Sequence, residues 1–369
     1  MKRKIVIIRF IISIFFLISL VFMFFFKETF NFTNRFISFY GSFVIAIYSF
    51  FYGIENIIDK KINLGIFFIL FFIMIMILNI YMLRWKMTLG INSLNFDFSL
   101  FKKYSFEHLE VCLGRKGTYK ERLDRALNLI DNAQKKDISL SIHLPIYLFE
   151  WYSYDYLSAF FIHPDKKKRD KSFKLLKRNL EKLEKYDINF LVLHFPGINH
   201  KNKDIDNFDK FLDDSLNKIN LLAKKYNQKI LLEYFGSNVL FADYNIWIKK
   251  IKKFSNLGIL LDTGHLYFSS ILNDFDFNIA FNKLKNNCEA FHFWTTKGKE
   301  IYGNNDFYQK YHHIIPNINQ KKNNNWAFDT KKIYENMLKT NKTIIIEASS
   351  LYKGKNYYYK SIDTLSKMI

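Results

Sequence analysis

Short apolar runs alternate with amphipathic stretches through the last two-thirds of this chain, and this alternation constrains the fold more than any other feature. From about Met87 onward, eight such runs have the length and composition of β-strands. These predicted strands are Met87–Ser93, His108–Leu113, Ile138–His143, Ile188–His194, Lys229–Tyr234, Leu257–Asp262, Cys288–Phe293 and Thr343–Glu347. Stretches with helical spacing lie between them, at Lys120–Lys136, Lys166–Tyr186, Asp204–Tyr226, Asn245–Phe254, Phe275–Lys285 and Asp329–Leu338, and a C-terminal one lies at Tyr357–Met368. Strands that alternate with helices pair in parallel, so we expect a parallel sheet covered by helices.

Eight predicted strands that alternate with helical stretches within residues 87–369 match the pattern of a (β/α)8 TIM barrel. An open, doubly wound sheet is the alternative α/β architecture. Such a sheet is expected to carry a glycine-rich turn that binds phosphate, and the sequence contains no GxGxxG or Walker-type motif. We therefore predict an α/β fold with a TIM barrel at 87–369.

Six of the predicted strands end on an ionisable residue or within about one residue of one. These residues are His143, His194, Glu233, Asp262, His292 and Glu347. A buried strand gains nothing by ending on an ionisable group. In a TIM barrel, however, the carboxyl ends of all strands converge on the face that carries the active site. We therefore expect these six side chains to gather in one pocket.

A pocket with this composition favours a bound divalent cation. Without a cation, the carboxylates of Glu233, Asp262 and Glu347 would face one another in a cleft, which is energetically costly. Mixed imidazole and carboxylate ligands suit zinc, with manganese as an alternative. Two further histidines, His265 and His313, follow predicted strands and are added to the candidate ligands. A single histidine at a strand end would be interpreted as structural, so the convergence of several carries this prediction.

The remaining histidines and the cysteines do not follow this pattern. We place His108, His163 and His200 on the surface or in loops. Two cysteines, Cys112 and Cys288, are too few for a disulfide scaffold, and neither lies in a thiolate metal motif. The net charge of +21 is compatible with a polyanionic substrate, although charge alone does not specify one.

The first 86 residues have a different composition. Three apolar stretches at about 5–26, 36–58 and 64–83 each approach the ~20 residues that a transmembrane helix requires. We therefore predict a transmembrane region at 1–86, an integral protein of the cell membrane, and the lipid bilayer as a partner. The basic residues at the N-terminus favour a cytoplasmic start, and three crossings would then place the barrel on the extracytoplasmic side.

At the residues singled out above, 87–369 resembles the xylose-isomerase-like TIM barrel superfamily. This superfamily includes endonuclease IV, which belongs to the family 2 apurinic endonucleases, and sugar isomerases and epimerases. The strongest motif is the LDxxH pattern Leu261-Asp262-Thr263-Gly264-His265. The segment Leu193-His194-Phe195-Pro196-Gly197 supports it, and Glu233, His292 and Glu347 follow in the family's order.

The two branches of the superfamily imply different ligand sets. Resemblance to the epimerase branch implies one metal on Glu233, Asp262, His292 and Glu347. Resemblance to endonuclease IV adds a metal on His143 and His194, with Glu233 and Glu347 bridging or serving both ions. It also implies a third metal, held by His265 and by an Asp-x-His motif. Here that motif reads Tyr311-His312-His313, so Tyr replaces the Asp, and Asp306 or His312 would have to substitute.

The resemblance therefore implies a divalent-metal-dependent enzyme, which the predicted transmembrane region would anchor in the membrane. The two early histidines favour an endonuclease IV-like phosphoester hydrolase. Glu233, Glu347 and His265 would be the catalytic residues. The alternative is a sugar isomerase or epimerase in which Glu233 and Glu347 exchange a proton beside a carbonyl. A third possibility is a non-enzymatic barrel with a structural metal. The substrate would be phosphorylated or contain a sugar, and the predicted anchor argues against repair of chromosomal DNA.

Overall fold

The computed structural model describes residues 88–95, 98–104, 106–114, 116–154, 160–195, 208–234, 243–298 and 311–369, together with the single residues Tyr52, Ile54, Ile66, Ile69, Leu70 and Ile73. The chain divides between Lys86 and Met87 into two units. The following description concerns the second unit, Met87–Ile369.

Eight parallel strands close into a barrel in which each strand pairs with its neighbours in sequence and β1 pairs with β8. The strands are β1 (Leu89–Asn92), β2 (His108–Val111), β3 (Ser139–His143), β4 (Phe190–Phe195), β5 (Ile230–Tyr234), β6 (Leu257–Asp262), β7 (Ala290–Phe293) and β8 (Thr343–Ile346). Each overlaps one of the eight predicted strands, and the predicted TIM barrel is confirmed.

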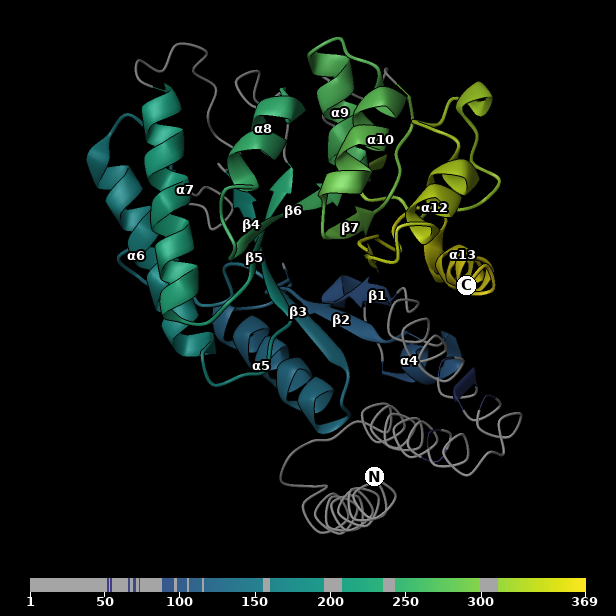
Figure 1. The fold of residues 1–369 in the computed structure, drawn as a ribbon, viewed down its shortest axis with the longest axis horizontal. Helices are drawn as coiled ribbons and strands as arrows, with labels where there is room; N and C mark the ends of the chain where they lie inside the picture. The colour runs from purple at the N-terminus through teal and green to yellow at the C-terminus, as the bar shows by residue number, and fades with distance from the viewer. Residues whose placement is uncertain are drawn as a thin grey trace. The chain divides into compact units, whose positions relative to one another are not determined.

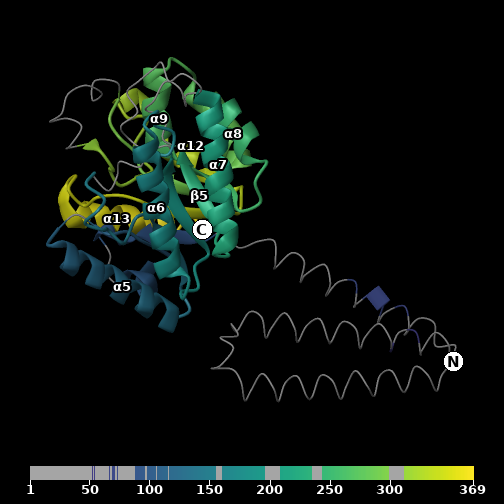
Figure 2. The same ribbon diagram turned by 90° about the vertical axis from the view of Figure 1, so that its left-hand side faces the viewer.

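Helices lie outside the strands and cover the barrel (Figures 1 and 2). They are α4 (Ser99–Tyr104), α5 (Tyr119–Lys135), α6 (Lys166–Leu183), α7 (Phe208–Lys225), α8 (Tyr244–Ile251), α9 (Thr263–Leu272), α10 (Phe277–Asn287), α12 (Thr330–Leu338) and α13 (Gly354–Ser366), with short 3-10 turns η1 (Ser93–Asn95) and η4 (Lys322–Asn324). Capping residues set several of the starts. Thr118 and Glu121 form a capping box at α5, and the side chain of Asp276 accepts a hydrogen bond from the backbone of α10.

The outward-facing side chains of the strands pack against the helices in one large apolar cluster. A second, smaller cluster fills the barrel interior on the side of β4 to β8. It consists of Phe190, Val192, Leu231, Leu260, Ala290 and Ile345. Because successive side chains of a strand point to opposite faces, the residue two positions after each of these also faces the interior. His194, Glu233, Asp262, His292 and Glu347 stand in that relation to the cluster.

The interior on the side of β1 to β3 is polar instead. It holds Asn92, His108, Glu110 and Ser141, all of them buried. His108 stacks on Phe190, with ring centroids 5.3 Å apart. The prediction that His108 lies on the surface or in a loop is therefore wrong, because the sequence does not reveal which polar residues of a strand face inward. His163 lies in the loop before α6, and His200 lies outside the described residues.

The predicted integral-membrane localisation requires correction. The expected spans at about 5–26, 36–58 and 64–83 lie outside the described residues, apart from the single positions named above. Within the described part of the chain, no helix combines the length and the apolar character that a bilayer crossing demands.

Gly264 lies in the first turn of α9, directly against the indole of Trp294. A Cβ at this position would overlap the Trp294 ring. We expect Gly264→Ala to destabilise the fold, because overpacking of about 1–3 kcal/mol outweighs the gain of about 1 kcal/mol from better helix propensity. Urea unfolding of the full chain measures the change. Asn282→Ala, at an exposed position of α10, is the control and should stay within about 0.5 kcal/mol of the wild type. A Gly264→Ala variant as stable as the wild type would contradict the prediction.

Candidate metal centre

The six strand-end residues meet at the carboxyl end of the barrel. His143 ends β3, Asp262 ends β6, and Glu347 directly follows β8, while the other three lie within the last residues of β4, β5 and β7. The register places His194 beside Glu233 and Asp262 beside His292 on neighbouring strands. All side chains except that of His194 are buried. The ionisable residues therefore stand where the apolar runs stop, because the strands reach this face of the barrel there.

His143, His194 and Glu233 form the first group of possible ligands. Both histidines direct Nε2 at the same carboxylate oxygen, at 3.2 Å from His143 and 2.9 Å from His194 to Glu233 Oε2. Their rings meet edge to face with centroids 4.6 Å apart. One ligand atom from each of the three residues lies within 4.8 Å of the others, which is close enough for one ion to contact all three.

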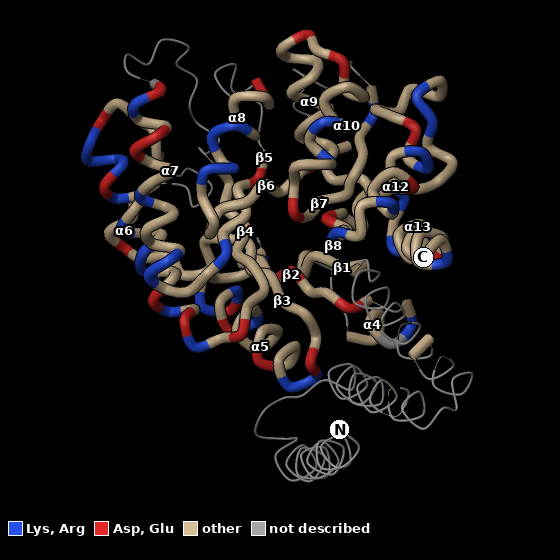
Figure 3. Tube along the Cα trace, viewed as in Figure 1, with Lys and Arg blue, Asp and Glu red and all other residues tan. Residues whose placement is uncertain are grey.

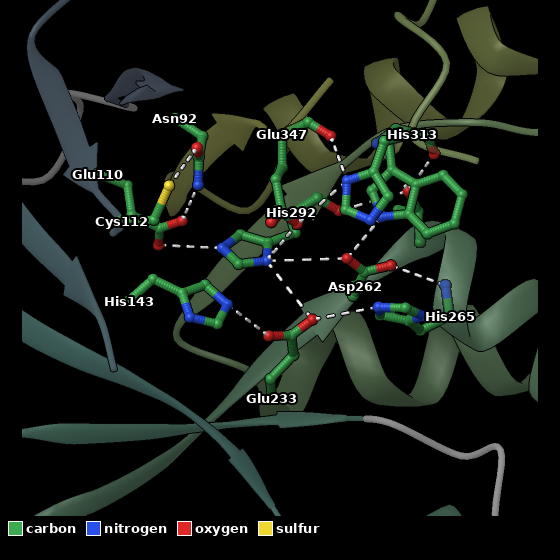
Figure 4. Close-up of polar contacts among 12 residues, drawn as sticks. Asn92, Glu110, Cys112, His143, Glu233, Asp262, His265, His292, His313 and Glu347 are labelled. Atoms are coloured by element: carbon green, nitrogen blue, oxygen red, sulfur yellow. Dashed lines mark hydrogen bonds and ion pairs between the residues drawn. The ribbon is translucent and has the colours of Figure 1, made fainter. Parts of the chain in front are cut away.

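The second group consists of Glu233, Asp262, His292 and Glu347, whose ligand atoms also lie within 4.8 Å of one another. His292 Nδ1 is 3.0 Å from Glu347 Oε2 and 3.7 Å from both Glu233 Oε1 and Asp262 Oδ2. Glu233 belongs to both groups, with Oε2 turned to the first and Oε1 to the second (Figure 4). Two ions, one in each group, would therefore share Glu233 as a ligand.

A third group brings together His265, His312 and His313. The rings of His312 and His313 have centroids 4.0 Å apart, and His265 lies 6.0 and 6.1 Å from them. From the sequence, either Asp306 or His312 had to substitute for the missing Asp of the Asp-x-His motif. His312 lies in the group, and Asp306 lies outside the described residues. Tyr311, which replaces the expected Asp, packs against Tyr352 at 5.9 Å instead.

Burial and neighbouring carboxylates determine the charge of these side chains. Burial, reinforced by Glu233 and Glu347, raises the pKa of Asp262 well above its ordinary value. Burial lowers the pKa of His143, but its hydrogen bond to Glu233 and the charge of that residue outweigh this effect and raise the pKa to about 9. For His265 burial dominates and lowers the pKa to about 3. Ligands must be deprotonated to bind a metal, so ion binding would displace protons from His143 and Asp262.

The donor atoms fit a divalent cation. Glu233 Oε1, His292 Nδ1 and Glu347 Oε2 are buried and lie in ion-pair contact with one another, but they make no hydrogen bond of acceptable geometry with any described residue. Buried polar atoms are almost always satisfied, because leaving them unpaired is costly. A divalent ion in the second group would satisfy all three atoms and offset the charge of three carboxylates. The nitrogen-rich first and third groups favour zinc among the possible ions.

Two further residues hold the ligands in place, and neither was predicted from the sequence. Trp294 donates its indole Nε1–H to Asp262 Oδ2 at 2.7 Å, while Asp262 Oδ1 accepts the backbone N–H of His265 at 2.7 Å and caps α9. Glu110 of β2 lies 3.0 Å from His292 Nε2. Trp294 follows β7 within an apolar stretch, and Glu110 lies inside a strand, so neither interrupts the sequence pattern.

Comparisons with known proteins agree with this architecture. The family model for the xylose isomerase-like TIM barrel matches residues 98–321. A crystal structure of a D-tagatose 3-epimerase-like protein is 18% identical with a TM-score of 0.50, over 76% of this chain and 96% of that one. Endonuclease IV from Thermus thermophilus is 12% identical with a TM-score of 0.48, over 76% and 100%. At such identities the similarity concerns the fold and not the activity. A search of curated proteins returned no significant match.

Removal of bound metal should destabilise the protein, because the buried carboxylates would then repel one another. We expect EDTA to lower the thermal unfolding temperature of the full chain and zinc to restore it. A ligand at a thousandfold excess over its Kd stabilises a fold by about 4 kcal/mol. Calorimetry with and without the chelator, alongside elemental analysis, checks this. Metal-free protein with an unchanged unfolding temperature would contradict the assignment of the centre.

The third histidine group makes a separate prediction about stoichiometry. His312→Ala removes one of three histidine ligands, so elemental analysis should find one ion fewer per chain than in the wild type. Tyr311→Phe is the matched control, because it alters the neighbouring residue without changing the histidine group. Equal metal content in the wild type and His312→Ala would show that this group holds no ion.

Proposed function

The chain belongs to the xylose isomerase-like TIM barrel family, and on that premise we propose that it is a divalent-metal-dependent phosphoester hydrolase. The proposal specifies a centre of two ions, with a third at the histidine group. The similar structures from this superfamily are enzymes, and they include an endonuclease and epimerases.

The position of Glu233 carries the proposal. Its two carboxylate oxygens face two different ligand groups, which a reaction that uses a single ion would not need. His143 and His194 would hold the first ion together with Glu233, and Asp262, His292 and Glu347 would complete the second. Divalent ions held there would lower the pKa of a water molecule and stabilise the charge that develops on a transferring phosphoryl group.

The residues around this pair have separate roles in the proposal. Glu347 is held as a carboxylate, since the charges of His292 and His313 outweigh its burial and lower its pKa to about 2. His265 is neutral at physiological pH and therefore suits a metal ligand or a hydrogen-bond donor to phosphate better than a general acid. Its Nε2 lies 3.5 Å from Glu233 Oε1, which links the third histidine group to the bridging carboxylate.

The charge of the molecule supports a phosphorylated substrate without defining it. Lys and Arg are spread over outer helices such as α6, α8 and α12, with Asp and Glu among them (Figure 3). The net charge of +21 favours association with polyanions, and a nucleic acid with an abasic site is the first candidate that the resemblance to endonuclease IV suggests.

A sugar isomerase or epimerase is the second candidate. It is favoured by the completeness of the second group, because Glu233, Asp262, His292 and Glu347 would suffice for a single ion. Glu233 and Glu347 would then exchange a proton beside a substrate carbonyl, and His143 and His194 would contact the substrate. Under this alternative the first and third groups would hold no ion.

Two substrates assayed in parallel separate the candidates. With zinc or manganese, we expect the full chain to cleave an oligonucleotide with one abasic site and to leave D-tagatose unchanged. His143→Ala should lower cleavage by on the order of 100-fold, or about 2.7 kcal/mol of transition-state stabilisation, because it removes a ligand from one of the two ions. His163→Ala, in the loop before α6, is the control and should cleave normally. Tagatose epimerisation that survives His143→Ala, without any cleavage, would support the isomerase instead.

A further inference from the structure

Beside the metal centre, the barrel interior contains a buried carboxylate that the proposed reaction does not use. Glu110 lies on β2, is fully buried, and sits on the polar side of the interior. Its Oε2 is 3.0 Å from His292 Nε2. The two residues are 182 positions apart in the chain and come from strands that do not pair with each other. The contact therefore crosses the barrel interior.

Several side chains hold the Glu110 carboxylate in this position. Asn92 donates its amide Nδ2 to Glu110 Oε1 at 2.7 Å (Figure 4). Ser141 donates to Glu110 Oε2 at a longer 3.5 Å, and His108 Nε2 lies 2.7 Å from the Ser141 hydroxyl. Three strands thus carry polar groups where the opposite wall of the barrel is filled by apolar side chains. Burial of a carboxylate is costly unless it is paired, so packing alone does not account for Glu110.

The geometry of His292 suggests what Glu110 does. A neutral imidazole has one nitrogen that donates a proton and one that can accept or bind a metal. Nδ1 of His292 faces the second ligand group, so the proton must reside on Nε2 if Nδ1 is to bind an ion. Carboxylates lie 3.0 Å from both nitrogens, namely Glu347 Oε2 at Nδ1 and Glu110 Oε2 at Nε2. Without Glu110, a proton on Nδ1 could pair with Glu347 and block the metal-binding nitrogen.

We propose that Glu110 is a positioning residue that accepts the Nε2–H of His292 and thereby directs Nδ1 at the metal. Carboxylates that hold metal-binding histidines in this way fix both the tautomer and the orientation of the ring. The inference rests on the proposed metal centre but not on the choice of reaction, because His292 is a ligand in both the hydrolase and the isomerase. It assigns a role to a β2 residue that touches neither ion nor substrate.

Metal binding by the full chain tests this role without any activity assay. Protein stripped of metal by a chelator is titrated with Co²⁺, whose visible absorption reports the ligand geometry, and Zn²⁺ affinity is measured against a chromophoric chelator. Glu110→Gln keeps the size of the side chain and removes the charge. We expect it to lower affinity at one site by about 10–100-fold and to change the Co²⁺ spectrum. Glu289→Gln, which removes an exposed carboxylate paired with Lys229, is the matched control and should behave as the wild type.

A double-mutant comparison shows whether Glu110 acts through His292. In a His292→Ala background, Glu110→Gln should cause no further loss of affinity, because the group that it positions is already absent. Equal losses in both backgrounds, or wild-type affinity and spectrum in Glu110→Gln, would overturn the proposal. If circular dichroism shows that Glu110→Gln does not fold, Asn92→Ser replaces it. That variant retains the carboxylate but loses its 2.7 Å anchor, and it should alter the Co²⁺ spectrum with a smaller loss of affinity.

The wild type separates this inference from the proposed function. A wild-type chain that binds neither Co²⁺ nor Zn²⁺ would overturn the metal centre and the role of Glu110 together. Wild-type binding that Glu110→Gln weakens, in a chain that cleaves no phosphodiester, would overturn the hydrolase alone and support the positioning role.

Discussion

The buried carboxylate of Glu233 is the interaction on which the arrangement of the site depends. It lies on β5, and four histidines from four other segments approach its two oxygens within 3.7 Å. An isolated carboxylate in this environment would be strongly destabilised. The surrounding imidazoles hold the pKa of Glu233 well below its ordinary value despite its burial. Elements far apart in the sequence are thus brought together around one charge.

Much of the fold and of the candidate site could be predicted, because both follow local patterns. A run such as Leu257–Asp262 is apolar where the strand is buried and becomes ionisable where it reaches the open end of the barrel. The eight candidate ligands lie at such ends or in the segments that follow, and each of the eight belongs to at least one group of possible ligands. Strand length and polarity were sufficient for this, since parallel strands align their carboxyl ends.

The features that the sequence did not reveal depend on closure of the barrel. Glu110 and His108 look like ordinary polar residues of one strand until β2 faces β7 across the interior. Trp294 acts on Asp262 through a contact between residues 32 positions apart. The predicted membrane localisation was wrong, because no helix in the described part of the chain has the length and apolar character of a bilayer span. Local sequence patterns determine where strands and helices form, whereas the contacts of Glu110, His108 and Trp294 join strands and helices that are separate in the sequence.

The unequal walls of the barrel interior have a consequence for how the chain reaches its native state. The apolar wall from β4 to β8 can collapse as soon as those strands meet, driven by the removal of apolar surface from water. Glu110 gains no such benefit, and its partner His292 arrives from a segment 182 positions later in the chain. The chain must lose the conformational entropy of closing this loop before the contact can contribute any stabilisation. We therefore expect Glu110 to remain hydrated until late in folding. The residue assigned to positioning a ligand would therefore also report a late step of barrel assembly.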